Sequence, residues 1–215
     1  MNIKGVIFDM DGTIIHNHLY HVNAWLHVCA ELGLHKTEAE ILSLFGKTNA
    51  ETFFALLGYH LSPQDLNHWA ERKEILYRKN YKGFVKPIKG LVDFLGLLKA
   101  NGIKTGLATS APTENVTFIL NESNLTGQFD IITDASSVSK GKPDPEIFLL
   151  TAKNLSVPPE NSLVFEDAFL GIMAAKAAHM KVISLITTFS REQLPEADLF
   201  IDDYTQLSLP LEQLF

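Results

Sequence analysis

The sequence predicts an α/β protein in which a parallel sheet has helices on both faces and a helical segment follows the first strand. Three observations lead to this prediction. Short, continuously apolar runs alternate with helical patterns, as in parallel sheets that are covered on both sides. Residues 16–83 show helical patterns only, and a segment of that length is not a loop. Polar residues follow several expected strands, at the edge where ligands bind in such sheets.

The first expected strand is an apolar, β-branched run over residues 3–8. It ends at the closely spaced carboxylates Asp9 and Asp11, and Gly12 then allows a sharp turn. Like charges this close raise each other's proton affinity unless a cation or hydrogen bonds compensate. Carboxylate oxygens suit magnesium, so the motif predicts a magnesium site. Taken alone, the motif is also compatible with a strand that ends in an acidic turn.

Four helices are expected in the segment that follows. The first covers residues 19–32 and presents an apolar face, and a capping box of Thr37 and Glu40 starts the second. The third has Asn49 as its expected cap and ends at Gly58; the fourth starts at Ser62 and Pro63 and runs to about Lys82. We interpret residues 16–86 as an α-helical cap domain inserted into a catalytic core formed by residues 1–15 and 87–215.

The remaining chain alternates strands with helices. Helices are expected over residues 91–100, 112–121 and 142–154 and in the small-residue run after residue 167. Strands are expected over residues 103–109, 129–133, 162–167, 181–186 and 198–201, with Ser190 and Gln193 capping the turn between the last two.

Four polar residues are predicted to meet at one edge of this sheet. Asp9, Thr109 and Asp167 end three strands, and Lys142 lies in the loop after the third strand. Each has a simpler explanation when taken singly. Thr109 could only close a strand, Lys142 could be a solvated loop lysine, and Glu166 with Asp167 could cap a helix. The predicted meeting of all four residues at one edge indicates a common site instead.

The chemistry that these groups share is phosphoryl transfer. Asp9 can attack phosphorus and form an aspartyl-phosphate, if magnesium held by Asp9 and Asp167, with Glu166 behind them, reduces the repulsion. Lys142 adds positive charge, and the Thr109 hydroxyl and amides near Ser110 can hold a phosphoryl oxygen. Asp11 can give and take the proton of the leaving oxygen, or it could merely brace the turn. As a proton donor it is expected to have a raised pKa.

The composition indicates which partners and which cellular location to expect. The chain has 215 residues, 46% of them hydrophobic and 20% charged, which is typical of a globular protein. Its net charge of −7 and lack of a basic run disfavour nucleic acid. No apolar run approaches the ~18 residues of a membrane helix. The single cysteine, Cys29, is expected in the core, and without an expected signal peptide we predict a cytoplasmic, monomeric protein.

The motifs DMDGT, ATS, KPDPEIF and FEDAFLGI, in this order, resemble the four motifs of the haloacid dehalogenase superfamily. The resemblance covers essentially the whole chain and implies a Rossmann-like core with magnesium-dependent phosphoryl transfer through Asp9. The predicted metal ligands are then Asp9, the backbone carbonyl of Asp11, and Asp167, with Glu166 behind them. The helical insert is similar to the class with a small α-helical cap, and within it to the β-phosphoglucomutase group and its phosphatase relatives.

The same resemblance implies substrate contacts for residues of the cap. It implies that His21 and Trp25 line the hinge and the substrate pocket and that Lys73 reaches the substrate; otherwise His21 and Trp25 read as one face of a core helix. In the mutases a cap arginine grips the second phosphate of a bisphosphate. The matching loop here offers Asn49, and Lys47 nearby, and neither reproduces a bidentate arginine fork.

The sequence therefore predicts a magnesium-dependent phosphatase of small phosphorylated metabolites, in particular sugar phosphates. The expected hinges of the cap are Pro87 and residues 13–17. A β-phosphoglucomutase-type phosphomutase is the first alternative, since it needs the same core. A phospho-receiver or binding module without turnover is an alternative of another class, because receivers also combine acidic groups, a hydroxyl and a lysine on an α/β sheet.

Overall fold

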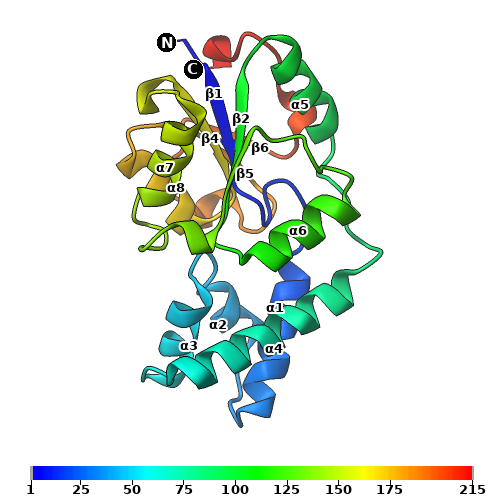
Figure 1. The fold of residues 1–215 in the computed structure, drawn as a ribbon, viewed down its shortest axis with the longest axis vertical. Helices are drawn as coiled ribbons and strands as arrows, with labels where there is room; N and C mark the ends of the chain where they lie inside the picture. The colour runs from blue at the N-terminus through cyan, green and yellow to red at the C-terminus, as the bar shows by residue number, and fades with distance from the viewer. Residues whose placement is uncertain (1, 215) are drawn as a thin grey trace.

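The computed structural model describes residues 2–214 and contains one parallel sheet of six strands in the order β3-β2-β1-β4-β5-β6 (Figure 1). The strands are β1 (Gly5–Phe8), β2 (Lys104–Ala108), β3 (Ile131–Thr133), β4 (Ser162–Glu166), β5 (Lys181–Leu185) and β6 (Leu199–Ile201). The central strand β1 pairs with β2 on one side and with β4 on the other. The predicted parallel sheet is confirmed. Its strand order changes direction at β1, so Asp9 follows the point where such sheets bind ligands.

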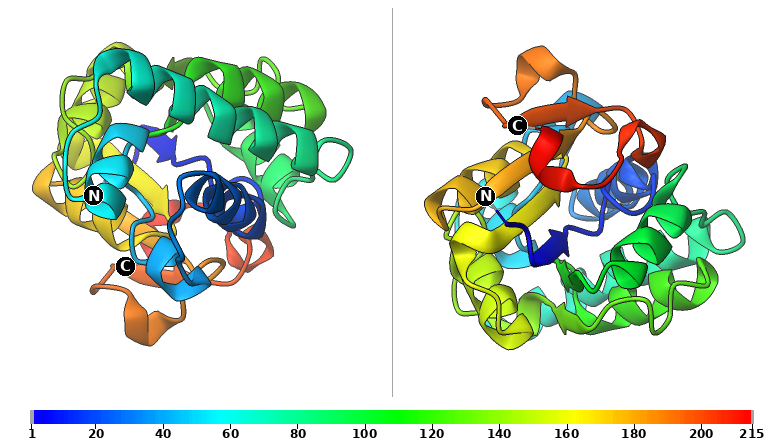
Figure 2. Two further views of the ribbon diagram at one scale, coloured as in Figure 1. Left: turned by 90° about the horizontal axis from the view of Figure 1, so that it is seen from below. Right: turned by 90° about the horizontal axis from the view of Figure 1, so that it is seen from above.

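Helices cover both faces of the sheet, as Figure 2 shows in views from the two ends. One face packs against α7 (Glu146–Leu155) and α8 (Phe169–Ala177), and the other against α5 (Leu91–Ala100) and α6 (Thr113–Glu122). Helix α7 begins later than predicted, because residues 142–145 form a loop that carries Lys142 into the sheet edge. The predicted span of α5 is confirmed.

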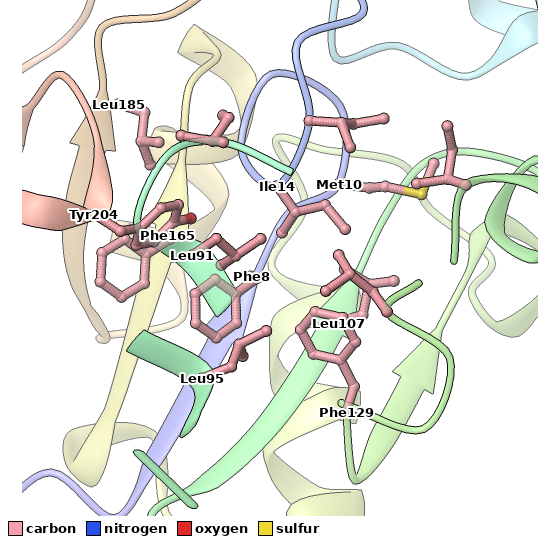
Figure 3. Packing of buried hydrophobic residues seen from close by; sticks show 14 of the residues in the cluster. Phe8, Met10, Ile14, Leu91, Leu95, Leu107, Phe129, Phe165, Leu185 and Tyr204 are labelled. Atoms are coloured by element: carbon pink, nitrogen blue, oxygen red, sulfur yellow. The ribbon is translucent and has the colours of Figure 1, made fainter. Parts of the chain in front are cut away.

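Aliphatic and aromatic side chains form the core on the α5 face (Figure 3). The Phe8 ring stacks on Phe165 at 5.1 Å between centroids, and Phe94 and Tyr204 pack on the same pair. Tyr204 keeps one polar contact inside this core, because its hydroxyl donates a 3.0 Å hydrogen bond to the Thr13 carbonyl. Apolar burial therefore fixes the strand that precedes Asp9, and one hydrogen bond ties down the turn that follows it.

The four helices predicted after β1 are present and lie together beyond the carboxyl ends of the strands (Figure 1). They are α1 (His18–Glu31), α2 (Glu38–Leu42), α3 (Asn49–Leu57) and α4 (Pro63–Tyr81). They share a hydrophobic cluster of their own, which includes Trp25, Cys29 and Phe53. Asn49 is not the cap of α3: Thr48 is, in a capping box with Glu51, and Asn49 is the first helical residue.

Two chain segments join these helices to the sheet, and they run side by side. Ile15 forms bridges with Asp11 and Pro87, and the Ile88 amide donates to the Ile14 carbonyl at 2.9 Å. Movement of the four helices as a unit therefore has to bend both segments near these bridges. Within residues 2–214, no helix is both long and apolar enough to cross a membrane.

Candidate active site

The edge of the sheet brings together the residues that the motifs predicted. Asp9 follows β1, Thr109 follows β2 and Asp167 follows β4, while Glu166 is the last residue of β4. Lys142 reaches the same point from the loop before α7. All five side chains are buried. Burial of this many ionisable groups is costly unless they compensate one another, so their arrangement decides what the site can do.

Lys142 is the positive centre of this group. Its Nζ donates to Asp9 Oδ1 at 2.5 Å, to Glu166 Oε1 at 2.7 Å and to the Ala108 carbonyl at 3.4 Å. Burial alone would lower the pKa of Lys142, but the carboxylates of Asp9 and Glu166 raise it, so the ammonium stays charged. All three of its donors are used inside the protein. Lys142 therefore orients Asp9 through one oxygen and leaves Oδ2 of Asp9 for another partner.

Glu166 is held on both oxygens. Oε1 accepts from Lys142, and Oε2 accepts from the backbone amides of Asp167 and Ala168 at 2.8 Å each. The first turn of α8 approaches so closely that a Cβ at Gly171 would lie 1.6 Å from Oε1. The small residue at this position makes room for the carboxylate, a requirement that the sequence showed only as a helix rich in small residues.

Replacement Gly171→Ala is expected to destabilise the protein by about 1–3 kcal/mol, because the added methyl group displaces Glu166 from Lys142. Thermal or denaturant unfolding measures this. Gly96→Ala in α5 is the matched control, since a Cβ there meets no atom within 4 Å. There alanine should stabilise the helix by about 0.5–1 kcal/mol. A change in stability of the same sign for both substitutions would contradict the packing of Glu166 against Gly171.

Asp9, Glu166 and Asp167 form an acidic cluster that fits a divalent cation. Each offers a carboxylate oxygen, and these three atoms lie within 4.8 Å of one another. Three carboxylates and the Lys142 ammonium leave a charge of −2 when all are ionised. Burial and the neighbouring carboxylates raise the pKa of both Asp9 and Asp167. A hard, doubly charged ion with oxygen ligands matches both the donor set and the missing charge.

The environment of Asp11 contradicts one prediction. Its Oδ1 accepts from Asn17 Nδ2 at 2.5 Å, and its Oδ2 lies 3.5 Å from His21 Nε2. Burial would raise its pKa, but His21, the Asn17 hydrogen bond and the charge of Lys73 together lower it below the ordinary value. The predicted raised pKa of Asp11 is therefore wrong for this state of the protein, because nearby donors and positive charge outweigh desolvation.

His21 connects Asp11 to the cap helices. Its Nδ1 lies 2.8 Å from Lys73 Nζ, and its ring stacks on Tyr77 at 3.8 Å between centroids. The Lys73 ammonium has donors only, so Nδ1 must be the acceptor. The other ring nitrogen, Nε2, faces Asp11.

Glu74 is buried beside His21 and Lys73 and accepts hydrogen bonds from several residues. Its Oε1 accepts from Lys73 at 3.0 Å and from Asn49 at 2.9 Å, and its Oε2 accepts from Asn115 at 2.7 Å. Asn115 belongs to α6 and also accepts from Arg78 of α4 at 2.7 Å. Polar contacts from one face of α4 thus connect the cap helices to the helices of the sheet.

These groups surround a single cavity of about 100 Å³ between the sheet edge and the helices α1–α4. Every predicted site residue lines it: Asp9, Asp11, His21, Trp25, Lys47, Asn49, Lys73, Thr109, Ser110, Lys142, Glu166 and Asp167. Sequence reasoning missed other lining residues, including Asn17, His18, Glu74, Asn115 and Thr188. The first four had no signal of their own, because they reach the cavity through the packing of α1, α4 and α6, and Thr188 lies in the loop after β5.

Two predicted phosphate contacts differ in their surroundings. The Thr109 oxygen accepts from the Ala111 amide at 3.0 Å, which leaves its hydroxyl hydrogen free to face the cavity. The Ser110 hydroxyl instead donates to the Gly46 carbonyl at 3.4 Å. Gly46 also lies against Leu170 of α8, where an added Cβ would come within 3.2 Å of the Leu170 side chain. Ser110 therefore contacts the loop between α2 and α3.

Comparison with known proteins agrees with this geometry. Residues 6–185 match the family model of haloacid dehalogenase-like hydrolases. A β-phosphoglucomutase of Bacillus subtilis is 31% identical over 217 residues, which cover 97% of this chain and 93% of the relative. A phosphorylated carbohydrates phosphatase of Thermotoga maritima is 31% identical over 181 residues, 84% of each chain.

A solved structure extends the similarity to the whole fold. The crystal structure of a β-phosphoglucomutase from Clostridium difficile matches with a TM-score of 0.87 and 31% identity, over 98% of this chain and 96% of that one. With phosphatase and phosphomutase relatives across nearly its full length, the protein is an enzyme of the phosphohydrolase or phosphotransferase class. The match of the family model to most of the sequence shows that the chain belongs to the haloacid dehalogenase-like hydrolases.

Proposed function

We propose that the protein is a magnesium-dependent phosphatase of small sugar phosphates that works through an aspartyl-phosphate. One observation carries the proposal: Lys142 holds Oδ1 of a buried Asp9, and Asp9 belongs to an acidic cluster that lines the cavity. The phosphatase and phosphomutase relatives support phosphoryl transfer. The family match also favours an enzyme over a phospho-receiver module.

In the first half of the reaction, Oδ2 of Asp9 attacks phosphorus and the bond to the leaving alcohol breaks. The Thr109 hydroxyl donates to a phosphoryl oxygen, and Lys142 offsets the charge of Asp9. The carboxylates of Asp9 and Asp167 and the backbone carbonyl of Asp11 would hold magnesium, which would supply positive charge to the phosphoryl oxygens. Glu166 lies behind them, since all its hydrogen bonds are made within the protein.

Asp11 handles the proton in this scheme. An anionic phosphate placed beside its carboxylate raises its proton affinity above that of the free enzyme, so that it can protonate the leaving oxygen. In the second half, the Asp11 carboxylate takes a proton from water, and the water oxygen attacks phosphorus. Inorganic phosphate leaves and the Asp9 carboxylate is restored. His21 and Asn17 keep Asp11 in place throughout.

Residues 16–86 would act as a cap that opens for the substrate and closes for the reaction. The cavity of about 100 Å³ is smaller than the roughly 300–1,000 Å³ that is usual for small-molecule sites. Substrate access therefore requires helices α1–α4 to move, and the bridges of Ile15 with Pro87 are the proposed hinge. His21, Trp25, Lys47, Asn49 and Lys73 would then form the wall that meets the sugar.

A phosphomutase is the second candidate, because β-phosphoglucomutases are similar to this chain over almost its whole length. A mutase has to hold both phosphates of a bisphosphate. Here Asn49 donates to Glu74, and Lys47 is the cavity cation for which residues 2–214 provide no carboxylate partner. One unpaired lysine is a weaker grip than a bidentate arginine, which favours the phosphatase.

Phosphate release from a panel of sugar phosphates tests the proposal. Hydrolysis is expected with magnesium, is expected to fall to background after chelation, and should return when magnesium is added again. Magnesium should also raise the midpoint of thermal unfolding, since it binds only the folded site. Conversion of β-glucose 1-phosphate to glucose 6-phosphate, with a trace of bisphosphate present, would identify a mutase instead. Hydrolysis that is equally fast with and without a chelator would contradict the metal site.

A further inference from the structure

Glu74 places a negative charge in the cap side of the cavity wall. Its side chain is buried, and it lines the same cavity as Asp9. Three donors of this wall, from Asn49, Lys73 and Asn115, point at its two oxygens. Burial would raise its pKa, but Lys73, His21 and the two asparagines lower it overall, so the group is ionised at neutral pH.

The cap side of the cavity therefore carries little net positive charge. The ion pair with Glu74 cancels the charge of Lys73 at 3.0 Å. The Lys73 ammonium also lies 2.8 Å from Nδ1 of His21, and burial lowers the pKa of His18. Lys47 remains as one positive charge on this side of the described cavity. A phosphate group carries about −1.5 to −2 at neutral pH, more than one lysine balances.

We propose that Glu74 is a specificity-determining residue that keeps a second phosphate group out of the cap side of the cavity and so restricts the enzyme to monophosphates. The inference rests on the proposed function and adds which phosphorylated sugars the same site accepts. Glu74 acts in two ways. Its charge repels an anion across a short distance at low dielectric, and its hydrogen bonds occupy Lys73 and Asn49, which would otherwise be free to bind that anion.

Binding measurements test this directly. Dissociation constants are measured by calorimetry with magnesium present, in an Asp9→Asn background that does not turn over its ligands. The probes are matched pairs: glucose 6-phosphate with glucose 1,6-bisphosphate, and fructose 1-phosphate with fructose 1,6-bisphosphate. Two variants weaken the field of Glu74 differently: Glu74→Gln removes the charge, and Asn49→Lys neutralises it while the contacts with Lys73 and Asn115 remain. Glu71→Gln, on the exposed side of the same helix, is the charge-matched control.

The protein with intact Glu74 is expected to bind the monophosphates more tightly than the bisphosphates. Both Glu74→Gln and Asn49→Lys should shift the ratio toward the bisphosphates by about tenfold or more, and Glu71→Gln should leave it unchanged. A residue with only a structural role would weaken both ligands of a pair alike. An unchanged ratio in both variants, or equal binding of both ligands at the outset, overturns the inference. Failure of the proposed function would give a different result, because the wild-type protein would then hydrolyse no monophosphate with magnesium.

Discussion

Replacement Asp9→Asn is expected to lower the rate of phosphate release by about 10⁴-fold or more, because the amide cannot accept the phosphoryl group. The fold should survive. Lys142 keeps its contacts with Glu166 and the Ala108 carbonyl, and loss of one anion relieves repulsion in a cluster where burial and the other carboxylates already raise the pKa of Asp9. Steady-state kinetics with magnesium, together with thermal unfolding, measure both effects.

The control for this substitution is Asp93→Asn, which removes a carboxylate from an exposed position on α5. It should leave the rate as it is in the wild type and lower the unfolding free energy by at most about 1 kcal/mol, because Asp93 lies in the first turn of α5. A folded Asp9→Asn protein that retains turnover within about tenfold of the wild type would contradict the assignment of Asp9 as the nucleophile.

Replacement Lys142→Met is expected to cost about 3–5 kcal/mol of unfolding free energy and to abolish turnover. Lys142 is the ammonium between Asp9 and Glu166, and without it these buried carboxylates face Asp167 with no counter-charge. The Asp9 carboxylate also loses the contact that orients it. Unfolding by denaturant in the presence of a chelator gives the change in free energy without a contribution from bound metal.

The loss of unfolding free energy in Lys142→Met should increase as the pH rises. Burial, Glu166 and Asp11 raise the pKa of Asp9, and burial, Glu166 and Asp9 raise that of Asp167, while Lys142 opposes both shifts. Without Lys142 the folded state holds still more protons than the unfolded state above about pH 3.9, so its stability falls with increasing pH. Lys142→Met should therefore differ more from the wild type at pH 8 than at pH 5.

Lys140→Met is the matched control, because this lysine lies two residues earlier and its side chain is 71% exposed. It pairs with Asp144 at the surface, where such contacts contribute at most about 1 kcal/mol. Its effect should be small and should not depend on pH over this range. A Lys142→Met protein as stable as Lys140→Met, or one destabilised mainly at low pH, would contradict the role of Lys142 as the internal counter-charge.

The sequence was most informative where structure depends on local pattern. The apolar runs located the strands, and the rule that ligands bind at the carboxyl ends of parallel strands brought Asp9, Thr109 and Asp167 to one edge. Capping chemistry located the start of α4 at Ser62 and Pro63. The cap of α3 was assigned wrongly, although Thr48 with Glu51 forms the capping box that the sequence also displays.

What the sequence could not predict depends on contacts between distant segments. Glu74 meets Asn115 across 41 positions, and neither residue belongs to a recognisable motif. The sign of the Asp11 pKa shift was predicted wrongly for the same reason. It depends on His21, Asn17 and Lys73, which folding brings around Asp11, and their combined effect exceeds that of burial. Helix α8 requires Gly171 only because Glu166 occupies the space beside it.

Mass spectrometry after rapid acid quench tests most directly whether Asp9 accepts the phosphoryl group. The wild-type protein is mixed with a sugar phosphate and magnesium, quenched during turnover and digested. A single added phosphoryl group is expected on the peptide that contains Asp9, and it should be lost on treatment with hydroxylamine. Sustained turnover with no phosphoryl group on that peptide, or with the group on a different residue, would contradict the account.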